Sequence, residues 1–259
     1  MRRFLLLLVI ALVLIGIGIC LGVMVDRHLN PPVKPPAQFT GASLQPCPDE
    51  YVLTRFQQLW FESRPWAENR WLGIQTLQYP TDVWVTQEIL FDTKPDFVVE
   101  CGSYRGGSAA AWATFLKETN PEGRVISIDI EDRMGDARKL PICKERVDFL
   151  VGSSIDPKIV AEVTRRVTGK KVFVLLDSLH TKEHVLSELR NYSPLVSKGQ
   201  YIEVQDTALS RHPIKAGLGG GAHEAVQEFL ASTDAFMSDG SRNRMILSCS
   251  PGGYLKRVK

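Results

Sequence analysis

Two acidic side chains close separate apolar runs in the second half of the chain. Asp177 follows the run at 171–176, and Asp206 follows the run at 200–205. If both runs are parallel strands, their carboxyl ends share one edge of a sheet and bring the two carboxylates together. Acidic oxygens gathered in this way suit a hard cation such as Mg²⁺. The pattern predicts a site with a divalent metal at this edge.

Histidines follow the first of these acids. His180 and His184 lie four positions apart, so they could share one face of a helix as metal ligands do. The chain lacks the His-Glu-x-x-His pattern of helical zinc sites, and Thr181 has the residue type of a helix N-cap. These features disfavour a zinc pair. They leave His180 as an active-site group near the metal, with a structural role as the alternative.

A glycine-rich turn follows an earlier apolar run, in Asp96-Phe-Val-Val-Glu-Cys-Gly-Ser-Tyr-Arg-Gly-Gly-Ser108. Gly102 permits a tight turn, and Gly106 and Gly107 allow a ligand to approach the N-terminus of the next helix. The spacing is Glu-x-Gly-x-x-x-Gly. It differs from the Gly-x-Gly-x-x-Gly of dinucleotide sites and therefore disfavours a dinucleotide oxidoreductase. The looser form resembles the first motif of class I S-adenosylmethionine (SAM)-dependent methyltransferases.

Asp129 closes the next apolar run, at 123–129. In doubly wound sheets, the acid at the end of the second strand hydrogen-bonds the ribose of the cofactor. A capping or solvated aspartate is the alternative. After the glycine turn described above, we expect the ribose role.

The elements that must position these residues alternate between strand and helix. This order predicts an α/β fold, a doubly wound Rossmann-like sheet of the SAM-methyltransferase type. A long glycine-rich connection at 207–221 is typical of a binding loop or lid. We expect strands at 97–100, 123–129, 146–151, 171–177, 200–206 and 245–248, and helices at 49–63, 83–90 (capped by Asp82), 109–116, 157–167, 185–194 and 222–231.

An uncharged and mostly aliphatic segment, 4–25, precedes the predicted domain. It is long enough to cross a bilayer core of roughly 30 Å as a helix. Its exit lacks the small-x-small pattern of signal peptidase sites, so an uncleaved anchor is favoured over a signal peptide. We expect a membrane anchor at 1–27, a Pro-rich linker at 28–48 and the methyltransferase domain at 49–259.

The side of the membrane on which the domain lies stays open. Arg2 and Arg3 outweigh Arg27, which Asp26 offsets, and this favours a cytoplasmic N-terminus with an exported domain. A SAM-using domain would instead favour the cytosolic cofactor pool. The net charge of +2 gives no reason to expect a nucleic-acid partner. The five cysteines show no disulfide framework, and a reducing compartment fits them better.

From about Trp66 to Arg257 the chain resembles the rhamnosyl O-methyltransferase and cephalosporin hydroxylase family of SAM-dependent enzymes. The motifs that carry the resemblance are Trp71-Leu-Gly-Ile74, Gln87-Glu-Ile-Leu90, Glu100-Cys-Gly, Gly106-Gly-Ser108, Leu176-Asp-Ser-Leu-His-Thr-Lys-Glu-His-Val185, Asp206-Thr207, His212-Pro213 and Pro251-Gly-Gly-Tyr-Leu255. Together they form a specific ordered set. The resemblance implies SAM in the cleft, a divalent ion held at the ends of strands four and five, and methyl transfer to an oxygen.

The resemblance also implies a role for each site residue. The methionine part of SAM would contact Glu100, Gly102, Ser103, Gly106, Gly107 and Ser108, the ribose Asp129, and the adenine Ser153, with Ser154 beside it. Mg²⁺ would bind Asp177, Gln205 and Asp206. Asp177 and His180 would be catalytic, with His180 as the base. This sequence departs from the family in Gln205, where Glu is usual, and in Leu179, where a second acid often stands. Both departures remove negative charge from the metal site.

The resulting hypothesis is SAM-dependent, Mg²⁺-assisted O-methylation of a sugar-like, lipid-linked or secondary-metabolite hydroxyl. The partners would be a small-molecule or glycolipid acceptor and, through the N-terminal helix, a membrane. The oligomeric state stays open, a homo-oligomer included. One alternative is a membrane-tethered SAM-binding protein with a degenerate metal site and no transferase activity. An oxidative reaction would need an iron site, and no His-x-Asp with a distant His stands out.

Overall fold

The computed structural model describes residues 50–211 and 221–259. The predicted anchor at 1–27, the predicted linker at 28–48 and most of the glycine-rich connection lie outside these residues. Within the described ranges, no helix combines the length and apolar character needed to span a bilayer.

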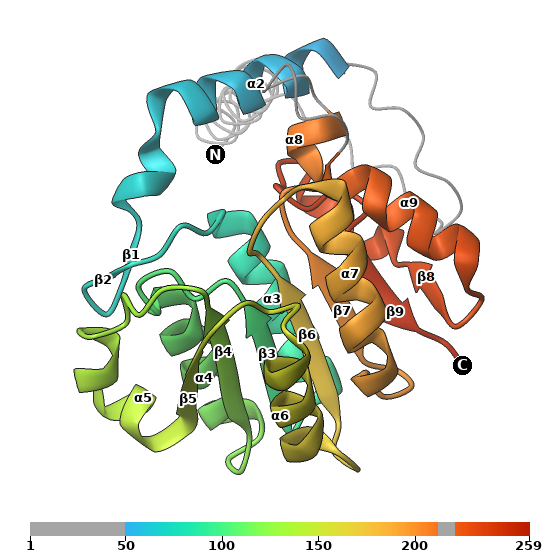
Figure 1. Ribbon diagram of the computed structural model, residues 1–259. Helices are drawn as coiled ribbons and strands as arrows, with labels where there is room; N and C mark the ends of the chain where they lie inside the picture. The colour runs from blue at the N-terminus through green and yellow to red at the C-terminus, as the bar shows by residue number, and fades with distance from the viewer. Residues whose placement is uncertain (1–49, 212–220) are drawn as a thin grey trace, which may run out of the picture. The chain divides into compact units, whose positions relative to one another are not determined.

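A mostly parallel sheet of seven strands forms the centre of the domain (Figure 1). Across the sheet, five neighbouring strands run parallel, and the two strands at the far edge pair antiparallel. The order reverses between β3 (Phe97–Cys101) and β6 (Val172–Leu176), which is where doubly wound sheets bind ligands. The predicted α/β architecture is confirmed. In spatial order the strands are β5 (Val147–Val151), β4 (Arg124–Asp129), β3 (Phe97–Cys101), β6 (Val172–Leu176), β7 (Tyr201–Val204), β9 (Tyr254–Arg257) and β8 (Phe236–Ser238).

Helices cover both faces of the sheet and enclose two apolar clusters. The strand β6 is buried along its whole length, as expected of a parallel strand covered on both sides. One face carries α3 (Pro80–Thr93), α4 (Gly107–Thr119) and α5 (Pro141–Arg146). The other carries α6 (Pro157–Val167), α7 (Lys182–Tyr192) and α9 (Ala222–Ser232).

The segment before α3 lies over the carboxyl ends of the strands (Figure 1). It contains α2 (Glu50–Ser63), the 3₁₀ turn η1 (Pro65–Glu68) and a hairpin of β1 (Arg70–Trp71) and β2 (Ile74–Gln75). Gln57 in α2 donates to the carbonyl oxygen of Ser248 and accepts from the hydroxyl of Tyr79. The contact with Ser248 therefore ties this segment to the C-terminal part of the domain.

Three sequence expectations differ from the structure. Residues 245–248 form no strand: the 3₁₀ turn η4 (Gly240–Met245) ends there, and the terminal strands are β8 and β9. The helix expected at 83–90 starts at Pro80, so Asp82 does not cap it. Instead Asp82 is buried and accepts from the Cys249 amide and the Tyr254 hydroxyl. Within the expected loop, Thr207–Arg211 is the helix α8. In each case tertiary contacts override the local pattern.

Candidate active site

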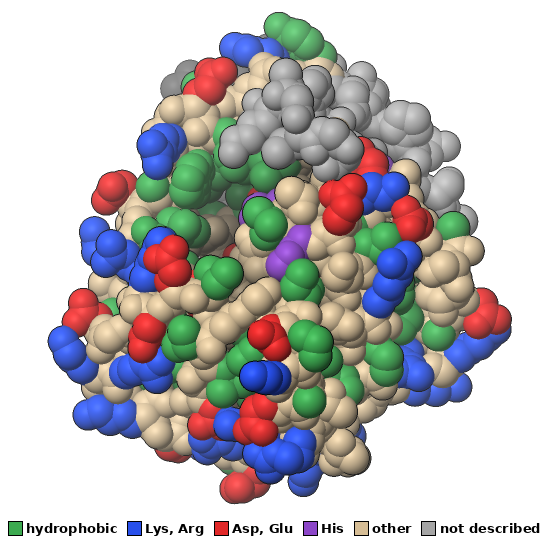
Figure 2. Space-filling view, in the orientation of Figure 1, with side chains coloured by type: hydrophobic (Ala, Val, Ile, Leu, Met, Phe, Trp, Pro, Cys, Tyr) green, Lys and Arg blue, Asp and Glu red, His purple; other side chains and the backbone are tan. Residues whose placement is uncertain are grey.

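A cavity of about 930 Å³ opens at the carboxyl ends of the parallel strands. Figure 2 shows the hollow, with histidine at its edge and hydrophobic side chains along its rim. The strand ends supply a polar floor that includes Gly102, Ser103, Asp129, Ser153, Asp177 and Asp206. The segment before α3 supplies a largely apolar wall that includes Trp60, Phe61, Trp66, Leu77 and Tyr79.

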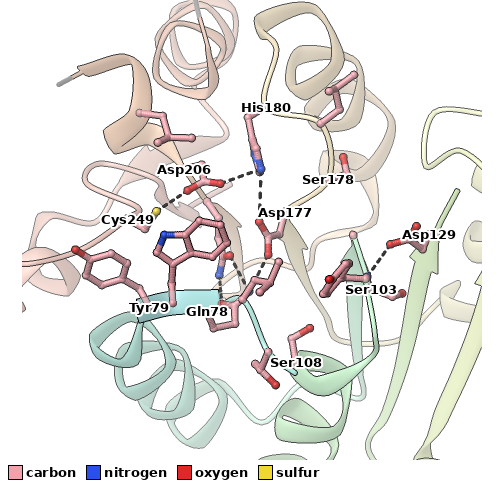
Figure 3. Close-up of a pocket in the computed structure, with 18 of the residues that line it drawn as sticks. Gln78, Tyr79, Ser103, Ser108, Asp129, Asp177, Ser178, His180, Asp206 and Cys249 are labelled. Atoms are coloured by element: carbon pink, nitrogen blue, oxygen red, sulfur yellow. Dashed lines mark hydrogen bonds and ion pairs between the residues drawn. The ribbon is translucent and has the colours of Figure 1, made fainter. Parts of the chain in front are cut away.

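Asp177, His180 and Asp206 meet on the floor of this cavity (Figure 3). Nε2 of His180 lies 2.8 Å from Oδ2 of Asp206 and 3.9 Å from Oδ1 of Asp177. One ligand atom from each residue falls within 4.8 Å of the others. The two strand ends therefore bring the two carboxylates together, and His180 lies between them.

Backbone geometry at the strand ends fixes this cluster. Asp177 directly follows β6, and its amide donates to the Cys101 carbonyl oxygen at 2.8 Å. A Cβ on Gly102 would lie 1.9 Å from the Asp177 carbonyl oxygen, so only glycine allows this approach. Asp206 has a φ of 60°, which is rare for a residue with a side chain. Such strain is typical of functional sites.

The outer oxygen of each carboxylate has its own hydrogen-bond donor. Gln78 Nε2 donates to Asp177 Oδ2 at 2.7 Å. The Cys249 thiol donates to Asp206 Oδ1. The sequence did not predict either donor, because neither residue belongs to a motif or lies near its own aspartate in the chain. The other oxygen of each carboxylate, Oδ1 of Asp177 and Oδ2 of Asp206, is left facing His180.

Gln205, predicted as a metal ligand, lines the cavity beside the two acids, where its side chain is hydrogen-bonded to a neighbouring glutamine. Its side-chain amide pairs with that of Gln78, with Nε2-to-Oε1 distances of 2.7 and 2.9 Å. Its Nε2 also donates to Glu203, which in turn accepts from Thr86. The Gln205 carbonyl oxygen thus accepts one hydrogen bond, from Gln78. In this structure Gln205 supports Gln78, and His180 is the third member of the cluster.

Electrostatics explain why a histidine lies between the two acids. Burial and the neighbouring Asp206 charge raise the pKa of Asp177 well above its usual value, while His180 opposes the rise. Burial lowers the pKa of His180, but the charge and hydrogen bond of Asp206 outweigh this effect and raise the pKa to about 9. At neutral pH the imidazole therefore holds a proton in this state. It must lose that proton before it can act as a base.

Several residues predicted to contact SAM line the cavity. They are Gly102, Ser103, Ser108, Asp129 and Ser153. Asp129 is fixed by two backbone amides, which donate from Tyr104 at 2.6 Å and from Glu131 at 3.0 Å. Its Oδ2 thus holds the glycine turn through the Tyr104 amide. Asp129 also borders the cavity.

The other predicted SAM contacts lie behind the cavity wall. Glu100 is completely buried and accepts from the Trp112 indole at 2.8 Å and from the Ser127 hydroxyl. Direct ligand contact by Glu100 is therefore corrected: the side chain faces α4, because alternate residues of β3 face opposite sides of the sheet. Gly106 starts α4 with a φ of 82°. A Cβ on Gly107 would lie 2.0 Å from Thr76 Oγ1, so this glycine accommodates the hairpin.

Comparison with known proteins finds a matching family model and similar enzymes. A family model described as rhamnosyl O-methyltransferase/CmcI matches residues 63–258. The rhamnosyl O-methyltransferase of Mycobacterium tuberculosis is 30% identical over 219 residues, which cover 81% of this chain and 86% of that protein. The enzyme of the same name from Mycobacterium leprae is 30% identical over 185 residues, covering 70% and 79%.

Solved structures share the fold. A CmcI structure with Mg and SAM has a TM-score of 0.58 and 19% sequence identity to this chain. The match covers 85% of this chain and 90% of that one. At this identity the likeness establishes the methyltransferase architecture.

Proposed function

The chain belongs to the rhamnosyl O-methyltransferase/CmcI family of SAM-dependent O-methyltransferases, and we propose that its acceptor is a sugar-like, lipid-linked or secondary-metabolite hydroxyl. The observation that carries this proposal is the meeting of Asp177, His180 and Asp206 on the floor of a cavity that also contains the glycine turn and Asp129. The curated relatives are named for a rhamnosyl acceptor, which supports a sugar hydroxyl.

The residues present fit a divalent cation. Asp177 Oδ1 and Asp206 Oδ2 both face His180 Nε2, so they converge on one point. Two carboxylates, with water completing the coordination shell, are a suitable donor set for Mg²⁺. We propose Asp177 and Asp206 as the Mg²⁺ ligands, a choice supported by the Mg in the CmcI structure. When bound, Mg²⁺ lowers the pKa of the acceptor hydroxyl and orients it.

The chain itself contributes alignment and proton transfer. The methyl group of SAM is intrinsically electrophilic, so rate depends on holding acceptor oxygen, methyl carbon and sulfur in line. Gly102, Ser103 and Asp129 would fix the cofactor on one side of the cavity, and the apolar wall would fix the acceptor on the other. His180, once neutral, lies beside the carboxylates and would accept the hydroxyl proton.

The predicted anchor at 1–27 lies outside the described residues and remains a prediction. It would hold the domain at a membrane, where a lipid-linked acceptor would be presented. A cavity with a polar floor and an apolar wall is compatible with an acceptor of this kind.

Calorimetric titration with SAM, with and without Mg²⁺, tests the proposal. We expect SAM to bind, and binding to tighten when Mg²⁺ and a rhamnoside acceptor mimic are present together. A methyl-transfer assay on the same rhamnoside then separates a working enzyme from a SAM-binding protein without activity. SAM binding without methyl transfer is the outcome expected of the alternative function, a SAM-binding protein with a degenerate metal site. The Gln78–Gln205 pairing favours this alternative, since no acid stands at position 205. Absence of SAM binding would contradict the proposal altogether.

A further inference from the structure

A carboxylate on α7 is buried without a strong cation beside it. Glu188 is fully buried within the apolar cluster that contains Val185, Leu189 and Tyr192. Among the described residues, the only ion-pair partner of its carboxylate is His184, whose Nε2 lies 3.4 Å from Oε1. Glu188 Oε2 has no hydrogen-bond partner there. Burying a carboxylate in this way opposes folding, so the side chain calls for a functional reason.

The hydroxyl groups around Glu188 are oriented by it. Ser154 Oγ donates to Glu188 Oε1 at 2.5 Å, and Ser178 Oγ donates to the same oxygen at 2.6 Å. An ionised carboxylate only accepts hydrogen bonds, so each serine uses its single hydroxyl proton in the bond to Glu188. His184 Nε2, 3.2 Å from Ser154 Oγ, must then be the donor in that contact. Toward any other partner, both serines present lone pairs only.

Both serines line the cavity, as does His184. Ser154 follows β5, and Ser178 follows β6 (Ser178 is labelled in Figure 3). Both hydroxyls reach the same Glu188 oxygen, so the two serines lie together where the loops after β5 and β6 meet. Gly152 and Ser153 of the first loop also line the cavity. If Asp129 holds the ribose, the base attached to that ribose extends into this part of the cavity. Glu188 itself does not reach the cavity surface, because it is completely buried.

We propose that Ser154 and Ser178 form an acceptor pair selective for the exocyclic amino group of adenine, with Glu188 as the positioning residue that fixes their polarity. This inference rests on the proposed function. An amino group donates to the serine lone pairs. A purine with an oxo group at the same position presents an acceptor and meets two acceptors, so it is rejected. The buried acid thus acts through two serines, one in the loop after β5 and one in the loop after β6.

The test compares two ligands that differ at this one group: S-adenosylhomocysteine and its 6-oxo counterpart, S-inosylhomocysteine. We expect the protein to bind the amino form at least about 10-fold more tightly. In Glu188→Gln, the amide can donate to one serine, whose hydroxyl proton then turns to the cavity. The ratio of the affinities for the amino and oxo forms should fall to within about 3-fold of unity, mainly because the oxo form binds more tightly. The matched control is Glu183→Gln, an exposed position of the same helix, which should keep the wild-type ratio.

The ratio distinguishes polarity from mere packing, because a packing defect would weaken both ligands equally. An unchanged ratio in a folded Glu188→Gln protein, or equal wild-type affinities, would overturn the inference and leave the proposed function intact. If Glu188→Gln does not fold, Ser178→Ala decides: it should weaken the amino form alone, and equal weakening of both ligands would overturn the inference. If wild type binds neither ligand, the proposed function fails first.

Discussion

Gln78 Nε2 donates to Asp177 Oδ2 across 2.7 Å, although the two residues are 99 positions apart in the chain. Gln78 is buried just before α3, and its backbone carbonyl oxygen accepts from the Asn69 side chain. The amide of Gln205 holds the Gln78 side chain from the other side. The segment before α3 therefore fixes the orientation of the Asp177 carboxylate at the end of β6.

Gln78→Ala should release Asp177 and lower catalytic efficiency. A hydrogen bond to a charged group contributes about 1.5–3 kcal/mol, which corresponds to roughly 10- to 100-fold in rate. SAM affinity should change little, since Gln78 lies near the acidic cluster and away from Asp129. Steady-state methyl transfer and SAM titration measure the two effects. Gln87→Ala, a substitution within α3, is the control. Equal activity of the two variants would show that Gln78 does not position Asp177.

Asp129→Ala and Asp177→Ala should separate cofactor binding from turnover. Asp129→Ala removes the predicted ribose contact and the acceptor for two backbone amides, so SAM affinity should fall roughly 10-fold or more. Asp177→Ala should abolish turnover while SAM still binds, because it removes a carboxylate of the acidic cluster. Calorimetry and a methyl-transfer assay on both variants test this division. Full turnover by Asp177→Ala would eliminate the metal-and-base part of the mechanism.

Gly102→Ala should disrupt the site through its backbone. The new Cβ would lie 1.9 Å from the Asp177 carbonyl oxygen, at a φ of +101°, so strand end and turn must separate. Gly73→Ala is a matched control, since its φ is +85° but nothing lies within 4 Å of the Cβ. The control should be destabilised only by the strain of a side chain at positive φ, which costs roughly 1–2 kcal/mol. Urea unfolding should show a larger loss for Gly102→Ala, accompanied by loss of SAM binding. Similar losses would mean that the close approach to Asp177 does not matter.

Asp82 should make the domain less stable as pH rises from about 4 to 6. Burial raises the pKa of its carboxyl from the usual 3.8 to about 6. Between these values the native state holds a proton that the unfolded state has lost, so stability falls with pH, by about 3 kcal/mol in total. Asp82→Asn should remove this part of the dependence. Urea unfolding across pH 4–7, with Asp92→Asn on the exposed end of α3 as control, measures it. A parallel decline in wild type and Asp82→Asn would assign the effect to other groups.

Local sequence patterns predicted most of the framework. The order of strands and helices from 97 to 206, apart from the short helix α5, could be predicted because hydrophobic periodicity and glycine turns act over a few residues. The gathering of Asp177 and Asp206 followed from one general rule, that parallel strands end at the same edge. The same patterns failed at 245–248, where an apolar stretch forms no strand. Short apolar runs do not distinguish strand from irregular structure.

The sequence by itself thus determined the doubly wound sheet, the acidic edge and the glycine turn. Tertiary structure alone decided which polar groups pair. Glu100, predicted to contact SAM, faces Trp112 inside the domain, while Gln78, Cys249 and Glu188, which belong to no predicted contact set, hold or orient the cavity floor. The physical reason is that a side-chain hydrogen bond depends on direction within a few ångströms. That direction is set by distant segments packing together, and spacing along the chain does not encode it.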